Sequence, residues 1–493
     1  MTTRRARSVW LSKSKLIAFR QCPRRLWLEV HRPDLKDESD AAQQRFAIGH
    51  QVGEIARAAY PDGILIAPDN DIGRAKAETK AALEARRRKP LFEATFEAQG
   101  LLVRTDLLLP VRNGWHMVEV KSSTKAYGYH FEDAAIQAWV VREWGLPLKA
   151  ASLQLVDSSW VYRGGGDYRG LLKIESVDDA IGSLEAEVPT WLESARQIVS
   201  GPEPLVRMGR QCAEPFECAF QAHCSEGLKP AEMPIAWIPN LSPKRRATFE
   251  RAGITDIREV CLDELTDQQR AVAKAYKRGA VVVRPLAPSI RRQLKGKRHY
   301  LDFETVQFGV PIWPGTRPYA QIPFQWSCHI EEPGKPLRHE EFLDISGNDP
   351  SAAFADSLIS VLGVRGPVIV YGSFEKSRVL DLAARFPKRT KALKAIAARI
   401  VDLKPITREH YFHPGLGGSW SIKNVIRTIK PSYDYSNLDG VSDGMGASDA
   451  YLEAIDPETT ESRIEQIECD LRRYCGRDTE AMIHVLNCLE QRN

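Results

Sequence analysis

The chain has 493 residues, a length that predicts two or three domains, each able to bury its own hydrophobic core. Its composition, 43% hydrophobic and 27% charged, is globular, and a net charge of +5 is too small for this length to indicate a partner. No apolar run could cross a membrane, and no apolar segment follows the basic start, so we expect a cytoplasmic protein without membrane association, whose nine cysteines form no disulfide framework.

The first 60 residues are expected to be largely helical. Residues 11–19 combine serine caps with an apolar stripe, and Cys22 follows in an arginine-rich turn. A second helix, from about residue 41, carries His50.

Residues 91–123 change to an alternating pattern that predicts a group of short strands. Glycine-containing turns separate the first three strands, a helix follows, and two more strands flank a glycine-rich turn. The expected strands cover 92–96, 100–109, 115–120, 152–162 and 170–174, and the expected helix covers 131–144.

Charged residues at the ends of two of these strands predict a catalytic site. Asp106 closes one strand, and Glu119 and Lys121 share one face of the next because side chains in a strand alternate. A carboxylate pair on adjacent strands can hold a divalent metal, and the lysine can orient water or stabilise charge on a phosphate. The alternative is a β-meander whose charged residues face water.

The Asp…Glu-x-Lys arrangement resembles the PD-(D/E)XK nucleases, and His50 upstream with Gln137 on the following helix resembles the added motifs of their RecB-like branch. This resemblance implies a restriction-endonuclease-like core. It also implies Asp106, Glu119 and His50 as metal ligands, with Lys121 and Gln137 completing the catalytic set.

After a helix over about 177–199, bent at Pro189, three cysteines are separated by five residues each, with phenylalanines between them: Cys212, Cys218 and Cys224. Together with the distant Cys22, this trio resembles the [4Fe–4S] clasp of RecB-like nucleases, in which four thiolates hold the cluster. A zinc site of four cysteines, or of three cysteines and His223, is the alternative.

The middle of the chain reads as a linker followed by helices. Ser242 is expected to cap a helix that starts at Pro243 and ends at Gly253, and Thr255 to cap the next. The pattern resembles a helix-hairpin-helix without its usual glycines, and a plain helical spacer is the alternative. Basic residues here and over 291–298 could follow a nucleic-acid backbone or form a solvated face.

Acidic residues recur in the C-terminal part at positions that predict one site. Residues 299–305 read as a strand that places Asp302 and Glu304 on one face. Glu375 follows a second apolar strand, and Tyr474 and Asp478 lie four apart on a late helix, hence on one face. Clustered carboxylates of this kind suit Mg²⁺ or Mn²⁺.

In combination these elements resemble the DEDD 3′→5′ exonucleases of the RNase H-like fold, over roughly 299–490. The match is closer to an uncharacterised bacterial family, a domain of unknown function with a Leu-Asp-Phe-Glu-Thr motif, which this chain carries at 301–305. The resemblance implies four ligands for two metal ions, Asp302, Glu304, Glu375 and Asp478, with Tyr474 orienting the attacking water. Glu375 stands where most DEDD enzymes have Asp.

We therefore predict a multidomain α/β protein with three parts. Residues 1–228 form a PD-(D/E)XK domain with a cysteine cluster, 229–290 a helical linker, and 291–493 an RNase H-like mixed sheet with flanking helices. The predicted function is metal-dependent hydrolysis of nucleic acid, DNA more readily than RNA, at two centres. The alternatives are a protein with one active centre, and an iron–sulfur or zinc scaffold that binds without cutting.

Overall fold

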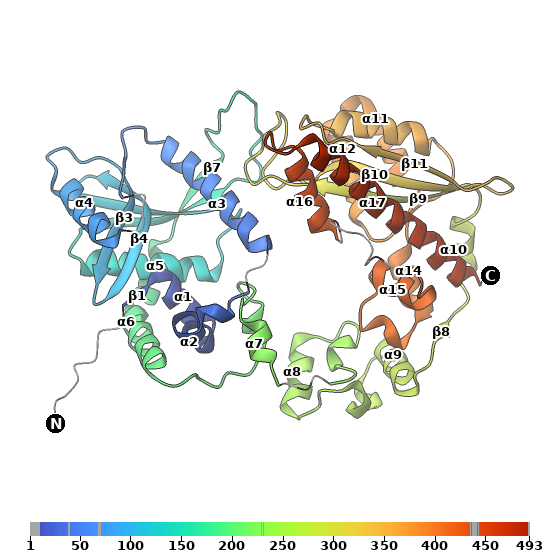
Figure 1. Cartoon of the computed structure of the whole chain (residues 1–493), viewed down its shortest axis with the longest axis horizontal. Helices are drawn as coiled ribbons and strands as arrows, with labels where there is room; N and C mark the ends of the chain where they lie inside the picture. The colour runs from blue at the N-terminus through green and yellow to red at the C-terminus, as the bar shows by residue number, and fades with distance from the viewer. Residues whose placement is uncertain are drawn as a thin grey trace. The chain divides into compact units, whose positions relative to one another are not determined.

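The computed structural model describes residues 10–37, 40–67, 71–227, 229, 231–433, 435, 441 and 443–491, without the side chains of 40–46. The chain folds into two compact units, the first formed by 1–228 with 308–320 and the second by 229–307 with 321–493. Each contains helices and a mixed sheet, so the expected multidomain α/β class is confirmed (Figure 1). Among the described residues, none of the helices combines the length and apolarity that a membrane span needs.

The first unit is built on a seven-stranded sheet with strand order β2-β3-β4-β5-β6-β7, in which β1 pairs with β4. Strands β3, β4 and β5 form an antiparallel meander, and α5 crosses over to β6, which is parallel to β5. The strands are β1 (Leu11–Ser12), β2 (Ile64–Leu65), β3 (Leu91–Ala98), β4 (Leu101–Val111), β5 (Gly114–Lys121), β6 (Leu148–Val156) and β7 (Leu172–Ser176).

Helices cover both faces of this sheet. One face packs on α5 and α6 through a core that includes Met117, Ile136 and Trp191, and the other packs on α3 through Ala56 and Val118. The helices are α1 (Lys13–Gln21), α2 (Pro23–His31), α3 (Asp40–Ala58), α4 (Ile72–Glu84), α5 (Gly128–Glu143), α6 (Asp178–Ser200) and α7 (Gln221–Ser225).

Two expectations for this part are corrected. The strand expected over 152–162 ends at Val156, because Asp157 forms a turn in which its carboxylate accepts a hydrogen bond from the Ser159 amide at 2.9 Å. Residues 308–320, placed in the C-terminal domain by sequence, pack with the first unit, where Thr316 O accepts a 3.0 Å hydrogen bond from the Tyr162 amide.

The second unit holds a five-stranded mixed sheet with strand order β11-β10-β9-β12-β13. The central strand β9, which carries Asp302 and Glu304, is antiparallel to β10 and parallel to β12. The strands are β9 (Arg298–Val306), β10 (Ile322–Glu331), β11 (Arg338–Leu343), β12 (Val368–Val370) and β13 (Ile400–Asp402); β8 (Val282–Val283) and β14 (Tyr411–Phe412) form a separate pair.

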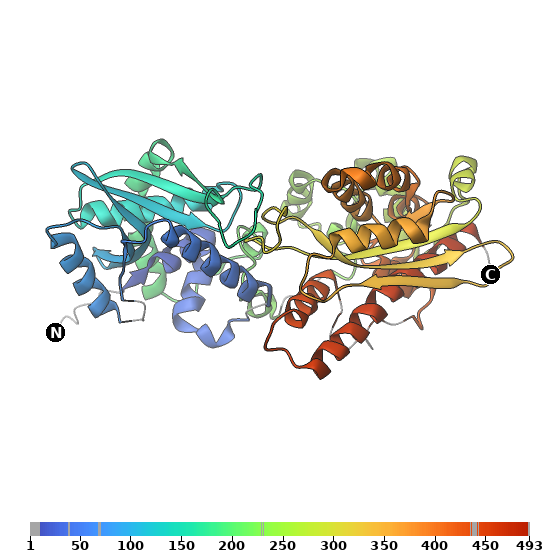
Figure 2. The ribbon, with the colours of Figure 1, turned by 90° about the horizontal axis from the view of Figure 1, so that it is seen from above.

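Helices flank this sheet on both sides. Figure 2 shows the orange helices above the yellow strands and the red α17 (Glu461–Glu490), 30 residues long, below them. One face packs on α11 (Ser351–Leu362), α12 (Phe374–Arg385) and α13 (Thr390–Ala397). The opposite face packs on α17, and its core also takes in residues from 235 to 294. The remaining helices are α14 (Leu403–His410), α15 (Ile422–Ile429) and α16 (Gly444–Ala454).

The segment before the sheet forms α8 (Pro243–Arg251), α9 (Asp267–Arg278) and α10 (Pro288–Gln293). Ser242 caps α8 as predicted, by accepting a hydrogen bond from the Arg245 amide. Thr255 does not cap the next helix: Asp256 caps a 3-10 turn, and Thr266 caps α9. Two 3-10 turns separate α8 from α9, so they are not joined by one short hairpin turn.

Candidate functional site

Four carboxylates of the second unit come from three elements that meet at one end of its sheet. Asp302 and Glu304 project from β9, and Glu375 lies in the first turn of α12, directly after β12. Asp478 and Tyr474 are one turn apart on α17. Glu304, Glu375, Asp478 and Tyr474 are all less than a tenth exposed, and Asp302 is half-buried.

Burial and mutual repulsion control the charge of this carboxylate cluster. Burial, followed by the neighbouring Asp478, raises the pKa of both Asp302 and Glu304 well above their usual values. Burial also raises the pKa of Asp478, and it raises that of Glu375 to about 7. Four carboxyl groups that suppress one another's ionisation form a site in which a divalent cation would restore the charged forms.

Several neutral or cationic groups surround the carboxylate cluster. Tyr435 donates a 2.7 Å hydrogen bond to Asp478 Oδ1, and Lys423 Nζ lies 3.2 Å from Tyr474 Oη, with the ammonium 4.8 Å from the centre of that ring. Lys423 favours the ionised forms of Glu304 and Asp478. Glu375 Oε2 is buried and has no hydrogen-bond partner, so it is an acceptor available to a cation.

Cys475 also contacts the carboxylate cluster, with its Sγ 3.7 Å from Asp302 Oδ2. One ligand atom each of Asp302, Glu304 and Cys475 lies within 4.8 Å of the other two. Burial and Asp302 raise the thiol pKa well above its usual value, so the sulfur stays protonated and donates to the carboxylate. Asp402, at the end of β13, caps α14 by accepting a hydrogen bond from the Lys404 amide at 2.9 Å.

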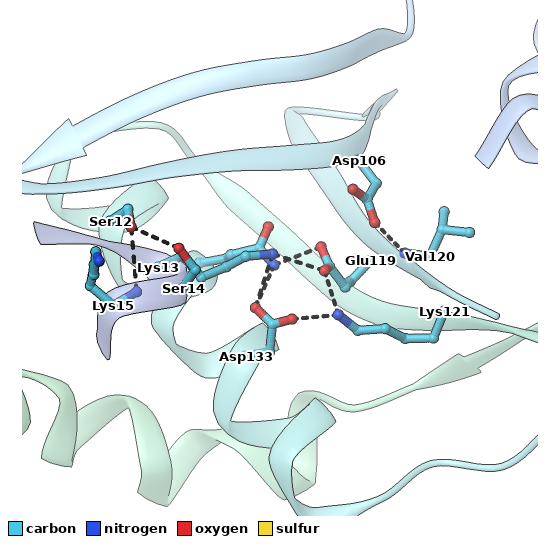
Figure 3. Close-up of polar contacts among 10 residues, drawn as sticks. Ser12, Lys13, Ser14, Lys15, Asp106, Glu119, Val120, Lys121 and Asp133 are labelled. Carbon is cyan, nitrogen blue, oxygen red and sulfur yellow. Dashed lines mark hydrogen bonds and ion pairs between the residues drawn. The ribbon is translucent and has the colours of Figure 1, made fainter. Parts of the chain in front are cut away.

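In the first unit, three of the predicted residues, Asp106, Glu119 and Lys121, lie on neighbouring strands of its sheet (Figure 3). Asp106 lies in the middle of β4 and not at its end as expected, because the strand continues to Val111. It accepts a 2.7 Å hydrogen bond from the Val120 amide of β5. Lys121 Nζ donates to Glu119 Oε1 at 2.7 Å, and Gln137 Nε2 on α5 donates to Glu119 Oε2 at 2.6 Å. Four of the five predicted residues therefore meet at one point of the sheet.

Lys13 and Asp133 join Glu119, Lys121 and Gln137, and these five residues form the lysine–carboxylate site. Lys13 Nζ on α1 contacts Glu119 Oε1 at 2.9 Å and Asp133 Oδ1 at 3.0 Å, and Lys121 also bonds to Asp133 (Figure 3). Burial opposes the charge of both lysines, but Asp133 and Glu119 outweigh it and raise their pKa values. Burial and Glu119 raise the pKa of Asp106 well above its usual value.

His50, the fifth predicted residue, is exposed on α3 and lines a cavity of about 270 Å³ together with Asp106. Glu93 of β3 lines the same cavity, and burial raises its pKa. Its φ of 57° is in the left-handed region that a glutamate rarely adopts within a strand. Oxygen and imidazole groups thus converge on a cavity beside the lysine–carboxylate site.

The four predicted thiols line one cavity of the first unit, together with three arginines: Cys22, Cys212, Cys218, Cys224, Arg24, Arg25 and Arg207. Cys22 stands at the start of α2, and Gln21 Nε2 donates to Gln211 O and Phe216 O at 2.7 Å each, which ties α1 to the cysteine loop. Burial raises the pKa of Cys218 and Cys224. His223 is not among the cavity-lining residues; it lies 3.5 Å from Glu203.

Sequence reasoning missed Lys13, Asp133 and Tyr435. Asp133 lies four residues before Gln137 on α5, and that spacing could have placed both on one helix face. No local pattern indicates Lys13 or Tyr435, which reach their partners across 106 and 43 residues.

One region of the chain matches a protein family whose activity is not assigned. Residues 299–421, a quarter of the chain, match the family described as domain of unknown function (DUF2779). This region contains Asp302, Glu304 and Glu375 but ends before Tyr474 and Asp478.

The curated relatives that match the chain are uncharacterized proteins of Mycoplasma and Ureaplasma species. The chain is 28% identical to the uncharacterized protein MG366 of Mycoplasma genitalium over 39% of its length, and 25% identical to the MG366 homolog of Mycoplasma pneumoniae over 40%. It is 24% identical to the uncharacterized protein UU173 of Ureaplasma parvum over 43%. The chain spans about a third of the length of each of these relatives, 32%, 32% and 34%.

Proposed function

We propose that this chain is a metal-dependent nuclease that hydrolyses phosphodiester bonds, with DNA favoured over RNA and with an exonuclease centre in the second unit. The observation that carries the proposal is the carboxylate cluster itself: four acids gathered in one place, three of them buried, with raised pKa values and an unpartnered Glu375 oxygen. Gathering four acids in this way costs stability in a protein that binds nucleic acid without cutting it, because buried charges need a counter-charge.

The donor set of the cluster fits Mg²⁺ or Mn²⁺, because both prefer carboxylate oxygen. Asp302, Glu304, Glu375 and Asp478 would hold the ions, which would activate water and stabilise the leaving oxygen when bound. Tyr474 Oη would position the attacking water, and the adjacent Lys423 ammonium, 3.2 Å away, fixes the direction of that hydroxyl. The mixed sheet with helices on both faces is compatible with the RNase H-like fold that the motifs resemble.

In the first unit, Asp106, Glu119 and His50 would hold a metal, as in the PD-(D/E)XK nucleases that the motif resembles. Asp106 and His50 share a cavity, which supports this assignment. Lys121 would orient water or stabilise negative charge on the phosphate. The Asp106 carboxylate is held toward β5 by the Val120 amide, which fixes its direction.

A second candidate function applies to the first unit alone: binding nucleic acid without cutting it. The observation in its favour is that Lys13, Lys121 and Gln137 donate to both oxygens of Glu119. A carboxylate already compensated by two ammonium groups attracts a metal less strongly than a free one.

The four thiols fit an iron–sulfur cluster. Thiolates are the usual cluster ligands, and Arg24, Arg25 and Arg207 around the cavity would offset the negative charge of the set. Sulfurs around one zinc lie about 3.8 Å apart, as Zn–S bonds of 2.3 Å in a tetrahedron require. No three of these four thiols, all of which the structure describes, lie within 4.8 Å of one another. One zinc would need them closer together, so this observation supports the cluster.

The test compares wild type, Asp302→Ala, Lys121→Ala and the double variant on end-labelled single- and double-stranded DNA and RNA with Mg²⁺ or Mn²⁺. We expect Asp302→Ala to abolish stepwise loss of terminal nucleotides and Lys121→Ala to remove any remaining cleavage. Wild-type rates in Asp302→Ala would contradict the exonuclease assignment. Activity that is absent from Asp302→Ala and unchanged in Lys121→Ala would show that the first unit does not cut, as the second candidate requires.

A further inference from the structure

A segment that separates β9 from β10 in the sequence packs within the first unit. Residues 308–320, the arm, contribute Val310, which is 7% exposed, to a core that contains Val52 of α3. The Gly315 amide donates a 2.7 Å hydrogen bond to Tyr162 O, which ties the middle of the arm to the loop after β6. The arm is therefore part of the first unit, although it comes from the middle of the sequence that forms the second.

One contact of the arm is with the end of β5. The ladder between β4 and β5 ends before Lys121, and Tyr319 Oη donates a hydrogen bond to the carbonyl oxygen of Ser122, the next residue. Alternate residues of a strand direct their backbone groups to the same edge, so Ser122 O lies at the edge where the Val120 amide bonds to Asp106 of β4. Tyr319 thus supplies a partner for β5 beyond the last residue that pairs with β4.

A second contact of the arm is with α3, close to His50. Ile48, two residues before His50, and Tyr319 both pack against the core that contains Val310. A Cβ atom added to Gly309 would collide with Ile48 Cγ2 and would lie 3.0 Å from Tyr319 Oη, so the arm lies on the helix without room for a methyl group. The arm therefore contacts two of the elements that carry the predicted site residues.

The arm is constrained by its own contacts. The Tyr319 amide donates a 2.8 Å hydrogen bond to Phe308 O, which joins the two ends of the arm, and the Phe308 and Trp313 rings pack edge to face with their centres 5.1 Å apart. Tyr319 has a φ of 58°, in the left-handed region that a residue with a large side chain adopts only where its surroundings compensate for the strain. A segment constrained in this way can fix the groups that it contacts.

We infer that the arm positions Lys121 and His50 in the first centre, through the Tyr319 hydrogen bond on β5 and the close packing of Gly309 on α3. Metal ligands and catalytic groups depend on outer contacts that fix their direction, because small displacements cost affinity and rate. The inference deepens the proposed nuclease function and rests on it for the chemistry at this centre. The effect of the arm on β5 and α3 is a separate property, which the experiment measures independently.

The experiment compares two tyrosines whose hydroxyls each bond the arm to the rest of the first unit, in the full chain carrying Asp302→Ala. Tyr319→Phe removes only the hydroxyl that bonds to Ser122 O. Tyr168→Phe is the matched control, because its hydroxyl donates to Pro311 O at 3.3 Å instead of linking the arm to β5. Hydrogen–deuterium exchange of the backbone amides reports on β5 and α3, and calorimetric titration reports on Mn²⁺ binding.

We expect Tyr319→Phe to speed exchange over residues 119–123 about 5-fold, the effect of one lost hydrogen bond. It should also weaken Mn²⁺ binding at the first centre, the site that Asp106→Asn removes, about 10-fold, as is typical for groups that orient metal ligands. Tyr168→Phe should change neither quantity. Exchange over 119–123 that is unchanged in Tyr319→Phe, or changed equally in Tyr168→Phe, would overturn the inference, as would equally strong Mn²⁺ binding in the parent and Tyr319→Phe.

Two further variants test the contact with α3. Gly309→Ala should speed exchange over residues 47–53, because the added methyl group does not fit against the helix. Replacing 307–321 by Asn-Gly removes the arm and keeps the β9–β10 hairpin, whose end residues Val306 and Ile322 are paired; exchange over 47–53 should increase further, and that of β9 and β10 should not change. Exchange over 47–53 that both variants leave unchanged would overturn the inference. A parent chain that binds no Mn²⁺ at the first centre would contradict the proposed metal chemistry there, and the exchange results would still decide the role of the arm.

Discussion

The phenol of Tyr435 donates a 2.7 Å hydrogen bond to Oδ1 of Asp478, and both side chains are almost fully buried. Burial raises the pKa of Asp478, and this hydrogen bond opposes the increase. Tyr435 therefore keeps one acid of the carboxylate cluster closer to its charged, metal-binding form.

Replacing Tyr435 by Phe should raise the pKa of Asp478 further, because the charged form loses its strongest donor. Metal binding requires the carboxylate to be deprotonated, so Mn²⁺ affinity should fall and its pH midpoint should move up by about one unit, the equivalent of about 1.4 kcal/mol. Titration of the full chain with Mn²⁺ between pH 5 and 8, followed by electron paramagnetic resonance, measures the shift. Tyr433→Phe is the control, since Tyr433 bonds to Glu480 and Arg477 O instead; equal midpoints in both variants would disprove the role of Tyr435.

The metal-free chain should lose stability as pH rises toward neutrality, because of Glu375. Burial raises the pKa of Glu375 from 4.5 to about 7, so between these values the folded chain holds a proton that the unfolded chain releases. The contribution of this group is present below pH 4.5 and is lost as pH rises through 7, by about 3 kcal/mol. Urea unfolding in EDTA at several pH values measures it.

Glu375→Gln should show a flatter pH dependence, and saturating Mg²⁺ should remove the loss in wild type. Glu465→Gln, an exposed change on α17, serves as the matched control. A pH profile that is the same in Glu375→Gln and wild type would assign the dependence to another group. Glu375→Asp should weaken Mn²⁺ binding if Glu375 is a ligand.

Local patterns predicted the elements that carry the candidate sites, because alternation and helical spacing are short-range signals. Glu119 and Lys121 are two residues apart on β5, and Asp302 and Glu304 are two residues apart on β9, each pair in a strand as expected. The same signals could not find Lys13, which meets Glu119 across 106 residues. Tertiary packing of α1 alone brings that ammonium to the sheet.

The middle segment shows a second limit of sequence reasoning. Its proline, glycine and basic residues suggested a linker, yet Ile238, Phe249 and Tyr276 are buried in the core that also contains Met482 of α17. Ile238 follows a 3-10 turn, and Phe249 and Tyr276 lie on two separate short helices. No single period links them, so their common burial is not visible in the sequence. Experiments on the second centre therefore need the full chain.

Lys13→Met should lower the stability of the metal-free first unit and increase the stabilisation that metal binding gives it. The change leaves Glu119 and Asp133 with one ammonium instead of two, and removing one partner of a buried ion pair costs about 3–5 kcal/mol, less here because Lys13 is 24% exposed. The same excess of negative charge should strengthen Mn²⁺ binding. Thermal unfolding with and without Mn²⁺, in the Asp302→Ala background, measures both effects.

The control for this prediction is Lys15→Met on the same helix, whose ammonium bonds to Glu29 instead of the lysine–carboxylate site. We expect a larger metal-induced increase in melting temperature for Lys13→Met than for Lys15→Met. Equal increases would show that Lys13 does not compete with metal at Glu119.

The four thiols that line one cavity should hold a [4Fe–4S] cluster. Protein purified without oxygen should be brown and contain about four irons per chain, as four-thiolate ligation of this cluster requires. Iron analysis and visible absorption measure this directly. Colourless protein with one zinc per chain would disprove the cluster while retaining the shared metal site.

Serine variants test whether the cysteines clasp the chain together. Cys22 and Cys212 enclose roughly 190 residues, so a shared cluster would constrain the unfolded chain and stabilise the first unit. Replacing Cys22, Cys212, Cys218 or Cys224 by Ser should each bleach the colour and lower the melting temperature of the first unit, whereas Cys261→Ser, at an exposed position, should do neither. Activity that depends on Asp302 should persist in all of them, because its ligands lie on β9, α12 and α17. A Cys22→Ser protein that keeps both its metal and its stability would show that Cys22 does not take part in the clasp.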